Sequence, residues 1–124
     1  MHDHNHPKGP QTTAIHAGEG PDPATGASAP PIHMSSTFVA DEPLGFSAHD
    51  MGPDSPFVYA RWGNPTVAML EAKIAALEGV EACLCTASGM AAASPIFTTL
   101  PSAGDHVVVS DISSGGGAEL GRNT

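Results

Sequence analysis

The sequence predicts an α/β protein in which an extended arm is followed by a partial βαβ unit of a mainly parallel sheet. The first 65 residues contain 10 of the 12 Pro and 7 of the 14 Gly, which is typical of loop-rich chain. Apolar residues then recur at helical spacing over residues 65–78. Two short apolar segments at 81–86 and 106–110, separated by a second helical stretch, predict the two strands.

Composition limits the size of the protein and the class of its partners. A chain of 124 residues allows at most one small domain. The formal net charge of −9 argues against nucleic acid or an anionic membrane as a partner, but one arginine suffices for a phosphorylated small molecule. No stretch approaches the roughly 18 apolar residues of a membrane span, and the N-terminus lacks the apolar core of a signal peptide. We therefore expect a cytoplasmic protein.

Residues 1–11 are expected to form a disordered tail, in which His2, His4 and His6 alternate with other residues. Three imidazoles at this spacing can capture a transition metal, but such tracts are compositional signals of low specificity. The disordered interpretation is preferred, and no metal site is assigned.

Residues 12–58 are expected to form an extended arm without a core of its own. Within the arm, residues 12–18 can form a short turn or helical piece, and residues 35–39 are a candidate strand. A segment of this kind lies across another body, which is either the rest of its own chain or a partner subunit.

A helix is predicted over residues 65–78, with Asn64 as its N-cap, Pro65 as its first residue and Gly79 as its C-cap. Lys73 lies on this helix beside two glutamates. It is expected on a solvated face rather than as a catalytic amine.

The segment at 81–86 is expected to be a short buried strand. Cys83 and Cys85 alternate with apolar residues there and are expected to be buried free thiols, because neighbours at i and i+2 rarely suit a disulfide. A second helix is predicted over residues 91–100, with an irregularity at Pro95.

The segment at 106–110 contains three consecutive valines, which predict a strand that is buried on both faces. The Gly-rich residues 111–117 are expected to form the loop after this strand. Residues 118–124 are predicted to begin a further helix.

Tyr59 and Arg61 lie on a stiff segment just before the first predicted helix. A guanidinium binds phosphate through two parallel charge-assisted hydrogen bonds, which makes this pair a candidate phosphate site. The alternative is that Arg61 merely stacks on the ring of Trp62 at the surface.

Ser88, Gly89 and Met90 lie where the first predicted strand gives way to a helix. Ligands of open α/β sheets bind at such turns, because free backbone N–H groups and the helix dipole favour an anion. Gly89 allows close approach of the backbone, and Ser88 can add a hydroxyl. The alternative is that Ser88 only caps the helix.

Several stretches together resemble the N-terminal portion of the Cys/Met-metabolism family of pyridoxal 5′-phosphate (PLP) enzymes. That family includes cystathionine γ-synthase, cystathionine γ-lyase, methionine γ-lyase and O-acetylhomoserine sulfhydrylase. The matching stretches, in the order of the family, are TAIHAG at 13–18, PPI at 30–32, STF at 36–38, YAR at 59–61, NPT at 64–66, LE at 70–71, ALEG at 76–79, ASGMAA at 87–92, and GD at 104–105 with Val108.

The resemblance implies the PLP-transferase type I fold, with a large sheet domain, a smaller C-terminal domain and a homo-oligomeric assembly. Residues 59–124 would then be the incomplete start of the large PLP-binding domain. Gly89 and Met90 would hold the PLP phosphate with their N–H groups. Tyr59 and Arg61 would reach across a dimer interface to the phosphate of the neighbouring subunit. The reaction would be γ-elimination or γ-replacement on cystathionine, homocysteine or a homoserine ester.

The chain departs from the family at two points. Ser114 stands where the family has a tyrosine that stacks on the cofactor ring. The lysine that forms the Schiff base, the aspartate that pairs with the pyridine nitrogen and the C-terminal domain lie further downstream in the family. Lys8 and Lys73 match none of these positions. We therefore expect an N-terminal fragment that is inactive alone, with no catalytic residue assigned. The alternatives are a small non-catalytic module that binds phosphate or a subunit, and a metal-binding His tail.

Overall fold

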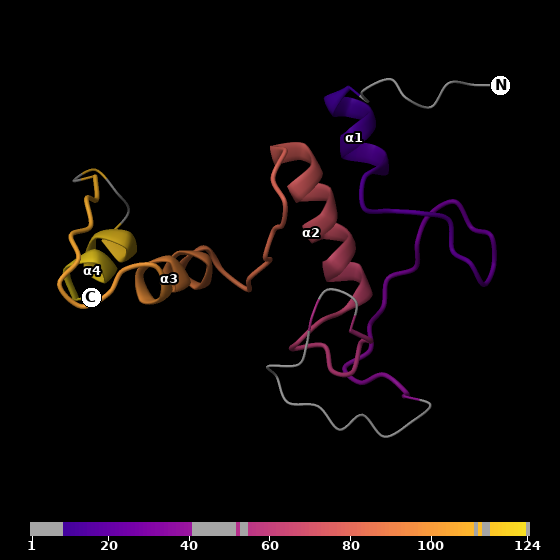
Figure 1. The fold of residues 1–124 in the computed structure, drawn as a ribbon. Coiled ribbons are helices and arrows are strands. Elements are labelled where there is room, and N and C mark those ends of the chain that lie inside the picture. The colour runs from indigo at the N-terminus through magenta and orange to yellow at the C-terminus, as the bar shows by residue number, and fades with distance from the viewer. Residues whose placement is uncertain (1–8, 41–51, 53–54, 111, 113–114, 124) are drawn as a thin grey trace. The chain divides into compact units, whose positions relative to one another are not determined.

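The computed structural model describes residues 9–40, 52, 55–110, 112 and 115–123 (Figure 1). These residues form four helices, which are α1 (Pro10–His16), α2 (Pro65–Glu78), α3 (Gly89–Thr99) and α4 (Gly115–Asn123). The chain divides into two compact units, Met1–Cys83 and Leu84–Thr124. The His-rich tail predicted within residues 1–11 and the position of Ser114 lie outside the described residues, apart from residues 9–11.

Helix α2 has the bounds and both caps that the sequence predicts. The Asn64 side chain accepts a hydrogen bond from the N–H of Thr66, and Pro65 opens the first turn. Gly79 ends the helix in the left-handed conformation with φ 67°, which glycine adopts without strain. Because these signals are local, they identify the helix without any tertiary information.

The arm packs on α2 more closely than the sequence indicates. The helical piece expected at residues 12–18 is α1, and the chain after it turns at Gly18, which has φ 71°. A Cβ on Gly18 would lie 2.4 Å from the carbonyl oxygen of Met69, so the arm backbone rests directly on the backbone of α2. Residues 10–18 are therefore attached to α2 and do not run free.

Lys73 holds this attachment, which contradicts the prediction of a solvated lysine. Its ammonium forms an ion pair with the Glu19 carboxylate and donates a hydrogen bond to the carbonyl oxygen of Ile15 at 3.3 Å. Its side chain is only 18% exposed. The prediction was wrong because helical spacing reports neighbours on the same helix, whereas Glu19 lies 54 residues away in the chain.

The strand expected at residues 35–39 is reduced to one antiparallel bridge between Thr37 and Tyr59. The N–H of Phe38 donates to Val58 at 3.1 Å, and the N–H of Ala60 donates to Ser36 at 2.9 Å. This bridge ties the arm to the segment that carries the tyrosine.

In the second unit, α3 begins at Gly89, two residues earlier than predicted, and continues through Pro95. Helix α4 begins at Gly115, so part of the expected loop at 111–117 is helical. A Cβ on Gly116 would lie 2.7 Å from the sulfur of Met90, and one on Gly121 would lie 3.8 Å from the ring of Phe97. Gly116 and Met90 lie near the starts of α4 and α3, and Gly121 and Phe97 lie further along the same two helices. The helices α3 and α4 therefore pack side by side in parallel.

The two predicted strands at 81–86 and 106–110 do not form, and the described residues contain no β-ladder beyond the single bridge. Cys83 and Cys85 are not joined in a disulfide, and they are half-buried rather than buried as the sequence predicted. Val108, expected to be buried, is 98% exposed. The reason is physical: a strand is stabilised by flanking strands and by layers on its faces, and two strands alone are not a stable sheet.

Little of the described chain is buried. Ala75 is the buried apolar residue and Asn64 the buried polar one among the described residues. Four apolar side chains of α2 stay between 37% and 49% exposed, namely Val67, Leu70, Ile74 and Leu77. No helix in the described ranges combines the length and the apolar character that a membrane crossing needs.

Candidate phosphate-binding site

Tyr59 and Arg61 lie together on a tight turn between the bridge and α2. The carbonyl oxygen of Tyr59 accepts hydrogen bonds from the N–H groups of Trp62 at 2.9 Å and Gly63 at 3.2 Å. This turn folds the chain back so that the Arg61 guanidinium carbon lies 5.0 Å from the centroid of the Tyr59 ring. The distance is within the range of a cation–π contact.

The sequence raised stacking of Arg61 on Trp62 as the alternative. The structure shows that the Arg61 guanidinium lies over the ring of Tyr59. Arg61 is exposed and Tyr59 is 38% exposed, so both the guanidinium and the phenol remain accessible from solvent. Because the guanidinium is exposed and carries five N–H donors, an anion can reach it from solvent.

Ser88 caps the N-terminus of α3, where the second group of predicted residues lies. Its hydroxyl oxygen accepts a hydrogen bond from the N–H of Ala91 at 3.1 Å, and its carbonyl accepts one from the Thr86 hydroxyl at 2.9 Å. The first-turn N–H groups of Gly89 and Met90 have no carbonyl partner within the helix. These two groups and the positive end of the helix dipole therefore point out of the helix.

Gly89 is required neither by backbone conformation nor by packing within the described residues. Its φ is not positive, and a Cβ built on it meets nothing within 4 Å. Gly18 is the opposite case, because its φ is positive and the chain itself fills the space. Open space above two free N–H groups is the arrangement that a phosphate needs for close approach to a helix N-terminus.

The structure thus brings Tyr59 together with Arg61, and separately brings together Ser88, Gly89 and Met90. The two groups belong to different units. Their joint role in one site stays a prediction.

The sequence did not indicate the tertiary role of Asn64. Its side-chain amide donates to the carbonyl oxygens of His33 at 2.9 Å and Ser35 at 3.5 Å, in addition to capping α2. An asparagine before a proline indicates an N-cap. The amide hydrogen bonds of Asn64, in contrast, go to residues about thirty positions away in the sequence.

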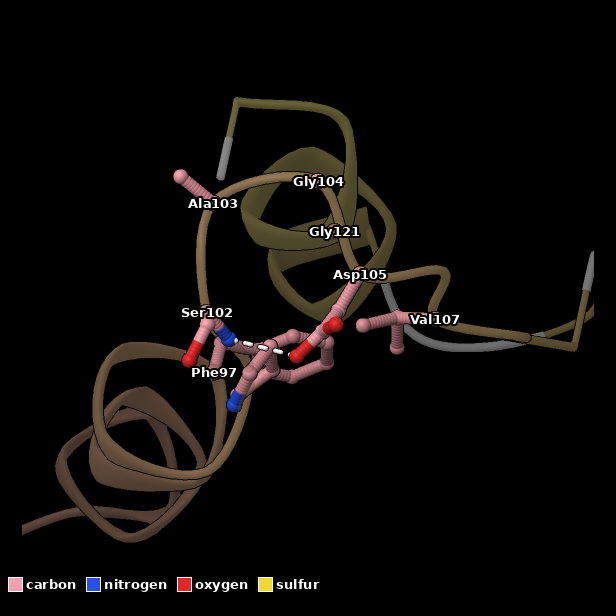
Figure 2. Close-up of a pocket in the computed structure, with 8 residues that line it drawn as sticks. Phe97, Ser102, Ala103, Gly104, Asp105, Val107 and Gly121 are labelled. Carbon is pink, nitrogen blue, oxygen red and sulfur yellow. Dashed lines mark hydrogen bonds between the residues drawn. The ribbon is translucent and has the colours of Figure 1, made fainter.

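A pocket of about 320 Å³ lies at the other end of α3 (Figure 2). In it, the Asp105 carboxylate accepts a hydrogen bond from the N–H of Ser102 at 2.7 Å. None of the predicted site residues lines this pocket, and its carboxylate would repel a phosphate. The lining residues are Phe97, Pro101, Ser102, Ala103, Gly104, Asp105, Val107 and Gly121.

Known proteins resemble this chain along most of its length. Residues 11–124 match the family described as "Cys/Met metabolism PLP-dependent enzyme". The cystathionine gamma-synthase of Mycobacterium tuberculosis is 47% identical over 108 residues, which are 87% of this chain and 26% of that protein. The L-methionine gamma-lyase of Fusobacterium nucleatum subsp. polymorphum is 45% identical over 97 residues, which are 78% of this chain and 24% of that protein.

A solved structure agrees with these sequence matches. The crystal structure of metB from Corynebacterium glutamicum superposes with a TM-score of 0.78 at 36% identity, covering 91% of this chain and 28% of that one. The predicted resemblance to an N-terminal portion is confirmed. The chain spans about a quarter of the length of the relatives that it matches.

Proposed function

Because the chain belongs to the Cys/Met metabolism PLP-dependent enzyme family, we propose that it provides the N-terminal, phosphate-binding part of a PLP-dependent sulfur amino-acid enzyme. The reaction of the whole protein would be γ-elimination or γ-replacement on cystathionine, homocysteine or a homoserine ester. Relatives with names of both kinds, a synthase and a lyase, match the chain at similar identity.

The observation that carries the proposal is the N-terminus of α3. The Ser88 hydroxyl oxygen accepts a hydrogen bond from the N–H of Ala91. The N–H groups of Gly89 and Met90 remain for a ligand. The open space at Gly89 fits a phosphate group, since a side chain at this position would fill it. The residues present therefore fit the phosphate end of PLP, whose ring, when bound, supplies the electron sink for the chemistry.

Tyr59 and Arg61 would provide the second half of the phosphate site, to a neighbouring subunit. The guanidinium offers paired N–H donors, and the phenol offers one more. Their exposure supports a role toward a group outside their own unit. In this arrangement, residues 12–58 are an arm that carries the pair to the partner, and the assembly is a homo-oligomer.

The chain alone would bind phosphate without catalysing a reaction. Its two lysines are Lys8 and Lys73, and the ammonium of Lys73 is engaged by Glu19 and the Ile15 carbonyl. An amine engaged in an ion pair and a hydrogen bond is not available as a nucleophile. Ser114 replaces the ring-stacking tyrosine of the family, so no residue of this chain is assigned a proton-transfer role.

The test is a titration of the full chain with pyridoxine 5′-phosphate, followed by NMR. This probe keeps the phosphate but lacks the aldehyde, so it cannot form adducts with lysines. We expect the amide signals of Gly89 and Met90 and the side-chain signal of Arg61 to shift along one common binding curve. Unphosphorylated pyridoxine is the control and should shift none of them. Equal shifts with both probes, or no shift with either, would refute the phosphate site.

A further inference from the structure

Asn64 is the buried polar residue among the described ones, with 8% of its surface exposed, and its side chain makes three hydrogen bonds. The oxygen accepts from the N–H of Thr66 at 2.9 Å, which caps α2. The nitrogen donates to His33 at 2.9 Å and to Ser35 at 3.5 Å. A cap needs only the acceptor, and serine or aspartate would supply it equally well. The amide donor is therefore an additional requirement that asparagine meets.

The segment that receives these bonds, residues 33–38, also supports the turn with the candidate phosphate pair. At its first residue, the N–H of His33 donates to the Thr66 hydroxyl at 2.9 Å, which doubles the attachment to α2. At its other end, Ser36 and Phe38 bond the backbone of Ala60 and Val58, on either side of Tyr59. A continuous set of hydrogen bonds thus runs from the start of α2 through residues 33–38 to the bridge.

The turn is consequently held from both directions. Covalently, Arg61 lies three residues before Asn64. Non-covalently, Asn64 fixes residues 33–35, and Ser36 fixes Ala60. Without the amide donor, the carbonyls of His33 and Ser35 would each lose a partner in a partly buried place. The segment would then move to regain water.

We propose that Asn64 is a positioning residue for the Tyr59–Arg61 pair, acting through residues 33–38 and independently of its capping role. The phosphate-binding part of this statement rests on the proposed function above. The geometric part, the stacking of Arg61 on Tyr59, does not.

The experiment uses NMR on the full chain with Asn64→Ser. Serine keeps the cap but cannot reach the carbonyls of His33 and Ser35. The first readout is the ring-current shift of the Arg61 side-chain protons, which lie over the Tyr59 ring in the native chain. We expect this shift to collapse while the carbon shifts of α2 stay helical. The second readout is the affinity for pyridoxine 5′-phosphate, which should fall about two- to tenfold, as expected for one neutral hydrogen bond.

Lys73→Gln is the matched control, because it releases the other attachment of the arm to α2 and leaves the Asn64 bonds in place. It should keep the Arg61 shift. Thr66→Val is the second variant, since it removes the acceptor of the His33 N–H but keeps the cap. It should weaken the Arg61 shift even if Asn64→Ser fails to fold.

The outcomes separate the two proposals. An unchanged Arg61 shift in both Asn64→Ser and Thr66→Val would overturn the positioning role and leave Asn64 as a cap. Failure of the native chain to bind pyridoxine 5′-phosphate would refute the proposed function, whereas the ring-current result would still decide the role of Asn64.

Discussion

Replacing Gly18 by alanine should detach the arm from α2. Gly18 has φ 71°, a conformation that costs an L-residue roughly 1–2 kcal/mol. The new Cβ would also lie 2.4 Å from the Met69 carbonyl oxygen and 2.9 Å from the Lys73 nitrogen, both of them backbone atoms of a helix. Neither can move aside as a flexible side chain would.

The contacts that oppose detachment are weak. The ion pair between Lys73 and Glu19 is partly exposed and is worth about 0.2–1 kcal/mol, and the bond to the Ile15 carbonyl adds about 1 kcal/mol. Ile15 itself is 62% exposed, so apolar burial adds little. Since strain and clash together exceed these terms, we expect the arm to leave α2 instead of the helix giving way.

Gly26→Ala is the matched control, because Gly26 also has φ 71° but a Cβ there meets nothing within 4 Å. Both variants carry the same backbone strain, and only Gly18→Ala carries the clash. The assay is the set of NMR cross-relaxation peaks between α1 and α2, which should vanish in Gly18→Ala and persist in Gly26→Ala. Persistence of these peaks in both variants would show that the arm does not pack as closely as the geometry requires.

Three further outcomes are expected. The Thr25 hydroxyl and the Ala24 N–H hold the pKa of Asp22 below its ordinary value of 3.8. Because a depressed folded pKa stabilises the turn only while the carboxylate is charged, the turn should persist above pH 3.8. It should open as the pH falls through the lower folded pKa; amide shifts of Gly26 that stay unchanged to pH 2 would contradict this. Ser88→Ala removes the cap of α3 and should cost about 0.5–2 kcal/mol of helix stability. This loss of stability would appear as faster amide hydrogen exchange in α3, and an unchanged exchange rate would exclude a capping role for Ser88. Arg61→Lys keeps the charge but loses the paired donors, so pyridoxine 5′-phosphate should bind more weakly; equal affinity would mean that charge alone acts.

The local features of the fold could be predicted from the sequence, and the long-range ones could not. Asn64–Pro65 and Gly79 identify both ends of α2 because caps act over one turn. The strands at 81–86 and 106–110 have the right composition, but their formation depends on neighbouring strands and covering layers.

The candidate site shows the same division. The cap at Ser88 could be predicted because a cap acts over one turn, whereas phosphate binding at Ser88 and Gly89 stays a prediction. The contact of Arg61 with the Tyr59 ring could not be predicted, because it depends on the tight turn at Tyr59. The roles of Lys73 and Asn64 were missed for one reason, which is that their partners come from the returning arm.

The exposed valines at 107–109 affect the tendency of the chain to self-associate and to be degraded. They are a short uncharged run of β-branched residues, and their backbone groups make no hydrogen bond within the part of the chain that the structure describes. Backbone groups left unpaired in such a β-branched segment can hydrogen-bond to the same segment of another molecule. Concentrating the chain would therefore drive self-association through this segment. In a cell, this segment would make the chain a substrate for chaperones and proteases unless another protein surface packed over it.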